Sequence, residues 1–178
     1  MQSAGIVLMC VVAAVLYGIA HDQITARVCV EYFTVGHPQV FPTADPTLLG
    51  LGWGIIATWW VGLLLGIPLA VVARAGSRPQ RSVGSLIRPV ACLLAVMAGC
   101  AAGAGVVGWF LADRGVVNLV DPLAQRLPAE RHVPFIADLW AHSASYFVGV
   151  VGGIVVLVLV WRSRGRADRQ QKRTQLES

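Results

Sequence analysis

The sequence predicts an all-α membrane protein: a bundle of four transmembrane helices with a small cap on the outer side. Three observations predict this class. Of the 178 residues 56% are hydrophobic, only 13% are charged, and four long stretches contain no Asp, Glu, Lys or Arg. A water-soluble domain carries about 25% charged residues, and a disordered chain combines low hydrophobicity with high charge. Both of those classes are therefore excluded.

The four charge-free stretches are 17 to 26 residues long and cover residues 4–20, 48–73, 89–112 and 143–161. At about 1.5 Å per residue they form helices of roughly 26 to 39 Å, against a hydrocarbon core of about 30 Å. Four membrane spans are therefore expected. The first is expected to be a retained helix and not a cleaved signal peptide, because no Lys or Arg precedes it.

The segments that connect the spans alternate in charge. Residues 21–47 and 113–142 carry net charges of −2 and −1, whereas residues 74–88 and 162–178 each carry +4. Because basic segments remain on the cytoplasmic side of a membrane, both termini are expected in the cytoplasm, with a basic, disordered tail from residue 162. The overall charge of +5 is therefore a topology signal and does not indicate nucleic-acid binding.

Glycines spaced by four residues indicate how the helices pack. Small residues allow close approach of helix backbones in lipid, where hydrophobicity contributes little to helix association. Such pairs occur in three of the spans: Gly50 with Gly54, Gly62 with Gly66, Gly99 with Gly103, and Gly149 with Gly153. The pattern predicts tight packing, either within one chain or between two copies of it. Pro68 predicts a kink in the second span.

Histidine and aspartate residues occur together at the predicted outer ends of two helices. His21 and Asp22 follow the first span, and a helix leading into the fourth span would place Asp138 and His142 on one face, one turn apart. Two imidazoles and two carboxylates at one depth predict a site for zinc, manganese or iron. Two residues of the first outer loop are expected as further ligands: Glu31 and His37.

An alternative explanation of these residues needs no metal. His21 near a helix C-terminus and Asp138 near a helix N-terminus each complement the dipole of their helix. The sequence contains no metalloprotease, paired-cysteine or phosphate-loop motif, and so indicates no catalytic residue and no organic cofactor. The spans contain no acidic residue, lysine or arginine, which argues against a proton-coupled transporter.

The first outer loop reads HDQITARVCVEYFTVGHP from His21 to Pro38. Its centre, residues 28–35, is rich in β-branched and aromatic residues and predicts a short extended segment that covers the bundle. Cys29 is the one cysteine outside the spans, so no disulfide within the chain is expected. This loop and the following PTLLGLGWGIIATWW resemble a group of uncharacterised bacterial multi-pass membrane proteins. The resemblance implies a location in the bacterial inner membrane and no particular chemistry.

Two functions of different class remain open on the sequence. The favoured hypothesis is a non-enzymatic bundle that binds a partner protein, a second copy of itself or a lipid through its outer cap. The alternative is a metal-binding or metal-dependent enzyme site at the outer membrane boundary. Trp59 and Trp60 lie near the middle of the second span, where they either line a pocket for a lipid or quinone, or face the lipid or fill space between helices.

Overall fold

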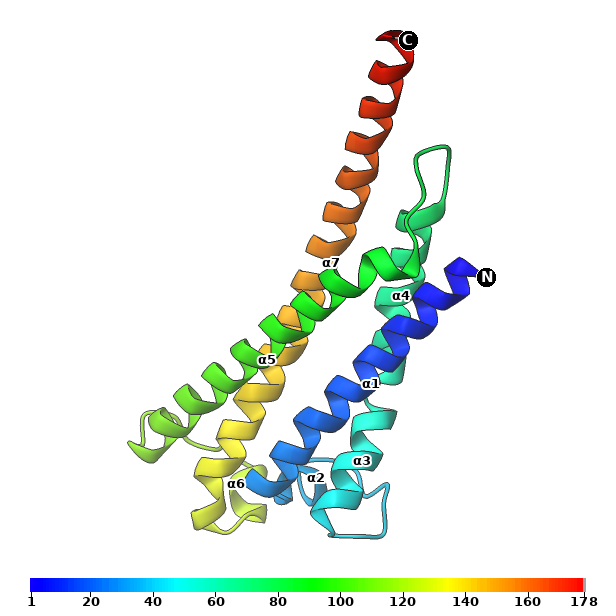
Figure 1. Cartoon of the computed structure of the whole chain (residues 1–178). Coiled ribbons are helices and arrows are strands. Elements are labelled where there is room, and N and C mark those ends of the chain that lie inside the picture. The colour runs from blue at the N-terminus through cyan, green and yellow to red at the C-terminus, as the bar shows by residue number, and fades with distance from the viewer. Residues whose placement is uncertain (178) are drawn as a thin grey trace.

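The computed structural model describes residues 1–177, and these residues are largely helical (Figure 1). In chain order the elements are α1 (Gln2–Val28), α2 (Glu31–Thr34), α3 (Pro46–Ile56), α4 (Trp59–Arg74), α5 (Val83–Asp113), α6 (Leu123–Arg126), the 3₁₀ helix η1 (Ala129–Arg131) and α7 (His132–Glu177). Four helical segments are long and apolar enough to span a membrane: α1, α3 with α4, α5, and η1 with α7. The all-α, four-helix prediction is confirmed, and the chain is a multi-pass membrane protein.

The second span consists of two helices. Helix α3 begins where the Asp45 carboxylate accepts a hydrogen bond from the backbone N–H of Leu48, at 2.8 Å, with Pro46 in the first turn. The helix stops at residues 57–58, where the Thr58 hydroxyl donates to the backbone carbonyl of Gly54. Helix α4 then continues through Pro68 to Arg74. The interruption of this span therefore lies at residues 57–58 and not at the proline.

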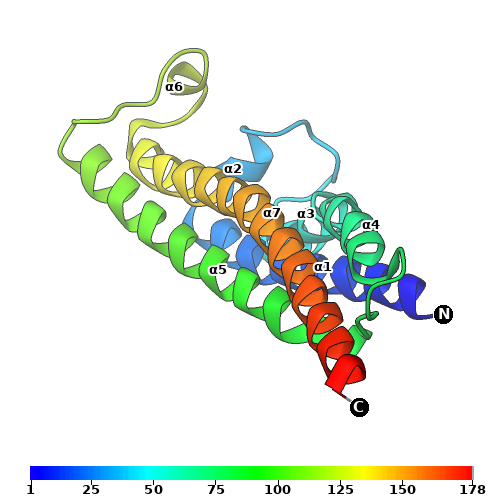
Figure 2. The same ribbon diagram turned by 90° about the horizontal axis from the view of Figure 1, so that it is seen from above.

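The helices form two groups that lie side by side (Figure 2). Helix α5 packs along α7, and α1 packs along both α3 and α4, whereas contacts between the two groups are fewer. One apolar core joins the groups and includes Ile6, Leu69, Leu86 and Val156. A second core lies under the loops at the other end and includes Cys29, Phe33, Leu49 and Phe135. We call the end that carries α2 and α6 the capped end.

The glycine pairs of the second span form a close seam with α1. A Cβ atom built on Gly54 would lie 2.5 Å from the Cα of Ile19, and one built on Gly62 would lie 2.5 Å from the Cα of Val11. These contacts within one chain confirm the tight packing expected for the second span. The pair Gly99 and Gly103 behaves differently, because a Cβ atom on either residue would meet nothing within 4 Å.

The extended segment predicted for residues 28–35 is wrong, because the structure forms helix there. Helix α1 continues to Val28, and α2 begins three residues later, at Glu31. The backbone N–H groups of Val35 and Gly36 donate hydrogen bonds to the carbonyl of Glu31. Four buried residues explain why helix prevails over β propensity: Asp22, Thr25, Ala26 and Cys29. Their spacing of three, four and seven residues places them on one helical face, which packs under the cap.

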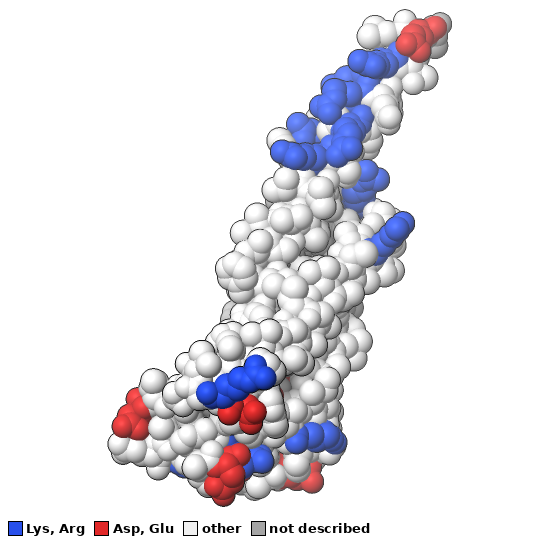
Figure 3. Space-filling view, turned by 90° about the vertical axis from the view of Figure 1, so that its left-hand side faces the viewer, with Lys and Arg blue, Asp and Glu red and all other residues white. Residues whose placement is uncertain are grey.

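Charge separates along the long axis of the molecule (Figure 3). Lys and Arg gather over the end that carries both chain termini, and the acidic residues other than those of the α7 tail lie near the capped end. We call the end with the termini the basic end. Helix α7 has 46 residues, or about 69 Å at 1.5 Å per residue, and so extends well beyond the bundle. The tail expected to be disordered from residue 162 is helical to Glu177.

Candidate functional site

His21 and His142 meet at the capped end although they are far apart in the sequence. His21 lies near the end of α1 and His142 lies in the third turn of α7. Nε2 of His21 is 3.4 Å from Nδ1 of His142, and the two rings stand edge to face with centroids 4.4 Å apart. The two helices therefore bring both imidazoles to one depth, as the sequence predicts.

Asp22 completes the cluster and determines its chemistry. Its side chain is buried, and Oδ1 lies 3.2 Å from Nε2 of His142. Nδ1 of His142 lies 3.0 Å from the backbone carbonyl oxygen of Asp138, which can only accept, so Nδ1 carries a hydrogen. In neutral His142 the lone pair of Nε2 would then face the Asp22 carboxylate. A proton shared by Nε2 and Oδ1, or a cation between them, makes this contact attractive.

The spacing of the three side chains suits a metal ion. One ligand atom each from His21, Asp22 and His142 can be chosen so that all lie within 4.8 Å of one another. Ligands of a tetrahedral zinc ion at about 2.0 to 2.2 Å are separated by roughly 3.3 to 3.6 Å. The hydrogen bond from His142 to the Asp138 carbonyl also resembles the outer-shell bond that orients metal-binding histidines.

Asp138 takes a different position from the one expected of a ligand. Its backbone carbonyl orients His142, while its carboxylate does not belong to the three-residue group. The residue is 4% exposed, and Oδ2 has no hydrogen-bond partner among residues 1–177. Burying a carboxylate oxygen without a hydrogen-bond partner costs free energy. Asp138 therefore lowers the stability of the fold next to the site.

The two reserve ligands have other partners. The Glu31 carboxylate accepts hydrogen bonds from Nε and Nη2 of Arg131, at 2.8 and 2.6 Å, and one from Cys29 Sγ at 3.4 Å. Burial raises the pKa of Glu31, but these bonds outweigh it and hold that pKa below its usual range. Nδ1 of His37 donates to the carbonyl of Tyr32 at 2.8 Å. Glu31 therefore ties α2 to the start of α7, and His37 lies beside the cluster.

An aromatic layer that the sequence analysis missed surrounds the cluster. The Tyr32 ring stacks on His142 with centroids 4.3 Å apart, and Tyr17 stacks on His21 at 5.8 Å. The Tyr17 hydroxyl also makes a 2.8 Å hydrogen bond with Ser145. A signal was present in the sequence, because Tyr17 lies one turn before His21 on the same helix face. The layer fixes both imidazoles between apolar groups.

A cavity of about 380 Å³ extends from this cluster into the bundle, and its lining is largely apolar. At the capped end it is lined by the polar side chains of Tyr17, His21, Asp22, His37 and His142. Toward the middle of the bundle it is lined by aliphatic side chains, among them Leu65, Leu93, Val150, Ile154 and Leu157. The volume lies in the range of small-molecule sites, roughly 300 to 1,000 Å³.

The cavity opens sideways toward the membrane between α4 and α7. Five of its lining residues are also exposed at the protein surface: Trp60 and Leu64 on α4, and Tyr146, Val150 and Ile154 on α7. Trp60 is therefore a lining residue, whereas Trp59 is exposed and lies outside the lining.

The fold and this site define a class of protein, namely a four-span membrane protein with a buried polar cluster at one end of an apolar cavity. Comparisons with protein-family models, with curated proteins and with solved structures yield no match. The cluster and the cavity are therefore the features from which a function can be inferred.

Proposed function

We propose that the protein binds an amphiphilic lipid inside the bundle, with the apolar chain in the cavity and an oxygen-bearing head group at His21, Asp22 and His142. The main support for this proposal is the cavity of about 380 Å³, which is apolar along its length and polar at the capped end. Such a distribution matches a ligand with one apolar and one polar end. The opening between Trp60 and Ile154 supports entry from the bilayer.

This proposal refines the hypothesis of a lipid or partner bound through the outer cap. The apolar core of the cap is packed inward, because Cys29, Phe33 and Phe135 are all at most 3% exposed. Tyr32 and Phe33 of α2 line the cavity. The cap therefore serves as the closed end of a site inside the bundle, and lipid is favoured over a partner protein as the ligand.

Two matched glycine variants test lipid binding. Gly153 lines the cavity, and a Cβ atom there would make only an ordinary 3.5 Å contact with Leu65, so Gly153→Leu fills the cavity. Gly103 is exposed and meets nothing within 4 Å, so Gly103→Leu adds the same atoms outside the cavity. Native mass spectrometry of the purified proteins measures the lipid retained on each. We expect comparable retention on wild type and Gly103→Leu and at least a fivefold loss on Gly153→Leu; equal retention on all three contradicts the proposal.

A second candidate function is the binding of a divalent metal ion at the same cluster. It is favoured by one specific observation, the approach of His142 Nε2 and Asp22 Oδ1 to 3.2 Å with Nδ1 already used as a donor. Two imidazoles and one carboxylate suit zinc, and also manganese or iron, with a fourth position for water or a lipid head group. In that case the ion would supply Lewis-acid chemistry at the end of the cavity.

Elemental analysis of protein purified without chelator tests the metal site. We expect about one metal ion per chain in wild type and in His132→Ala, because Nε2 of His132 bonds to the backbone carbonyls of Ala124 and Leu127, outside the cluster. The double variant His21→Ala with His142→Ala is expected to lose the ion. Metal far below one per chain in wild type would rule out this candidate and leave the lipid proposal standing.

We also propose an orientation, in which the basic end faces the cytoplasm of a bacterial inner membrane and the cluster lies at the outer boundary. The net charges of +4 on residues 74–88 and on residues 162–178 support it. Both termini then lie in the cytoplasm. In this orientation a lipid bound in the cavity has its head group in the outer leaflet.

A further inference from the structure

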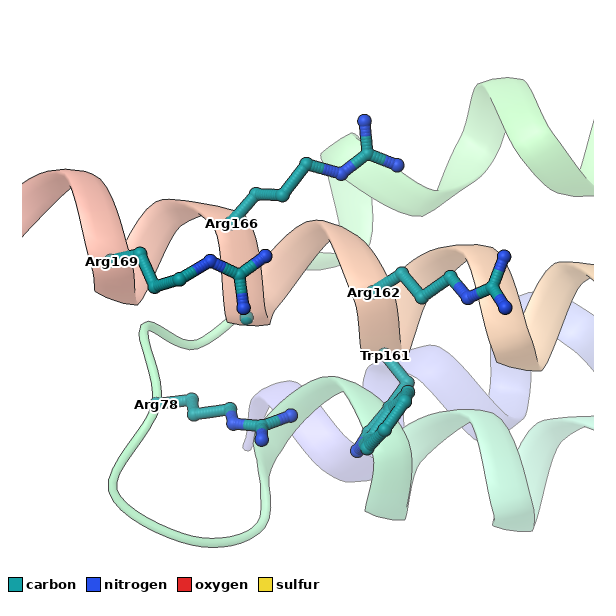
Figure 4. Close-up of a pocket in the computed structure, with 6 residues that line it drawn as sticks. Arg78, Trp161, Arg162, Arg166 and Arg169 are labelled. Carbon is teal, nitrogen blue, oxygen red and sulfur yellow. The ribbon is translucent and has the colours of Figure 1, made fainter.

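A second cavity lies at the basic end, where α7 leaves the bundle (Figure 4). Its volume is about 240 Å³. It is lined by Arg78 of the loop between α4 and α5, and by residues of α7: Trp161, Arg162, Gly165, Arg166 and Arg169. Four of the six lining residues are arginines and none is acidic. The cavity is separate from the cluster at the capped end and is not part of the proposed function above.

One buried arginine holds the wall of this cavity in place. Arg164 is 2% exposed, and its guanidinium donates hydrogen bonds to the carbonyl oxygens of Ala75 at 2.8 Å, Arg78 at 2.9 Å and Pro79 at 2.9 Å, and to that of Val72. Planar guanidinium groups with several partners are restricted in position. The loop that carries Arg78 is therefore attached to α7 by the fold itself, before any ligand binds.

Two of the arginines converge on the same small space. A Cβ atom built on Gly165 would lie 3.7 Å from Nη1 of Arg78 and 3.8 Å from Nη1 of Arg169, so the glycine leaves room for both guanidinium groups. The Arg78 guanidinium also lies over the Trp161 ring, 5.0 Å from its centroid. Figure 4 shows Arg78 on the loop and Arg169 on α7 on the same side of the helix.

The charge in this space is not balanced by the residues that line it. The acidic residue nearest in sequence, Asp168, forms an ion pair with Lys172 at 3.0 Å. Guanidinium groups held close together repel each other. An anion bound between them attracts both groups, so the net electrostatic interaction becomes favourable. Phosphate suits two arginines well, because its oxygens accept paired N–H donors from planar guanidinium groups.

We propose that this cavity binds the phosphate group of an anionic phospholipid from the membrane leaflet at the basic end. Trp161 lies at the end of the fourth span, as expected of an aromatic residue at a membrane interface. The neighbouring Val158 and Leu159 are exposed on α7 and offer an apolar surface for the acyl chains. These features favour a lipid over free phosphate as the source of the phosphate group, and basic residues at this depth attract anionic head groups.

Binding of short-chain, water-soluble lipids to the full-length protein in detergent tests the proposal. The probes are dihexanoyl phosphatidylglycerol, dihexanoyl phosphatidylcholine and inorganic phosphate, followed by thermophoresis. We expect phosphatidylglycerol to bind at least about tenfold more tightly than phosphatidylcholine or inorganic phosphate. Equal binding of inorganic phosphate and phosphatidylglycerol would support the phosphate site and identify a soluble phosphate as its ligand. Absence of saturable binding by all three probes overturns the proposal.

Three variants separate a built site from a diffuse basic surface. The double variant Arg78→Gln with Arg169→Gln is expected to weaken phosphatidylglycerol binding at least about tenfold, the cost of losing charge-assisted hydrogen bonds. The control, Arg88→Gln with Arg173→Gln, removes the same charge at exposed positions outside the cavity and is expected to change affinity less than about twofold.

Gly165→Leu keeps every charge and tests the geometry alone. Its side chain would occupy the space between Arg78 and Arg169, so we expect at least a fivefold loss of affinity. Correct folding of each variant is checked by its elution as a single species and by its helical circular dichroism. An equal loss in both double variants, together with unchanged binding by Gly165→Leu, would show a diffuse electrostatic surface and overturn the proposal.

Discussion

Replacing Gly62 by alanine adds one methyl group to the face of α4 that lies against α1. A Cβ atom at this position would lie 2.5 Å from the Cα of Val11 and 2.8 Å from the carbonyl oxygen of Cys10. Real Cβ atoms essentially never make contacts below 3.0 Å, and both neighbours belong to the backbone. The two helices must therefore move apart to accommodate the substitution.

The magnitude follows from two opposing effects. Overpacking of a close contact costs about 1 to 3 kcal/mol. Alanine in a helix is more favourable than glycine by about 0.5 to 1 kcal/mol. We therefore expect Gly62→Ala to lower the free energy of unfolding by roughly 0.5 to 2 kcal/mol. Gly103→Ala is the matched control, because its Cβ would meet nothing within 4 Å and only the helix preference changes. That variant is expected to be neutral or more stable than wild type.

The assay is reversible unfolding of the purified protein in mixed micelles, with sodium dodecyl sulfate as denaturant and circular dichroism as the signal. The free energy of unfolding is compared among wild type, Gly62→Ala and Gly103→Ala. Opposite signs for the two variants support the close seam between α1 and α4. If Gly62→Ala is as stable as Gly103→Ala, the two helices do not approach as closely as described.

Four further predictions concern the two ends of the bundle. Arg164→Leu is expected to lower the free energy of unfolding by about 3 kcal/mol, because four carbonyl groups lose a charged donor; a change below 1 kcal/mol by the same assay would contradict this. The pKa of Glu31 is lowered in the folded state, so the unfolded chain takes up the proton first as pH falls. The stability advantage of wild type over Glu31→Gln, about 1 kcal/mol, should therefore be full above the ordinary Glu pKa of 4.5 and disappear as pH falls through the lower pKa of the folded state, and a difference independent of pH would refute it. Burial and the neighbouring Glu31 raise the pKa of Cys29 to about 12, so its thiol should react with maleimide only after unfolding. Topology is then tested on a Cys29→Ser background: an impermeant maleimide should label Ala44→Cys in intact cells and Ser77→Cys only after permeabilisation, and the reverse pattern would invert the orientation.

The four spans were predictable because the cost of burying charge in a bilayer is set by local composition. A long stretch without charged residues therefore identifies a span, whichever other helices it packs against. The helical form of residues 21–35 was not recognised because two of the buried residues, Asp22 and Thr25, are polar. A search for apolar periodicity does not detect a helix face that contains a polar site. The β-branched residues between Val28 and Val35 then suggested a strand.

The cluster could be predicted in part. His21 and His142 flank the outer ends of two charge-free stretches, so the predicted span boundaries alone placed them at one depth. The partner of Glu31 could not be predicted, because Arg131 lies 100 residues away in the sequence. The cavity was equally hidden, since it depends on how the two groups of helices lie against each other and not on any one span. The sequence suggested Trp59 and Trp60 as lining residues, and only Trp60 lines the cavity.

The most direct test of the proposed function is a density map of the protein in lipid nanodiscs, determined by electron cryomicroscopy with a rigid binding protein as a marker. The proposal predicts elongated density that begins at His21, Asp22 and His142 and passes between α4 and α7 toward Leu157. A cavity closed by the side chains of Trp60 and Ile154, with lipid density confined to the outer surface of the bundle, would contradict it.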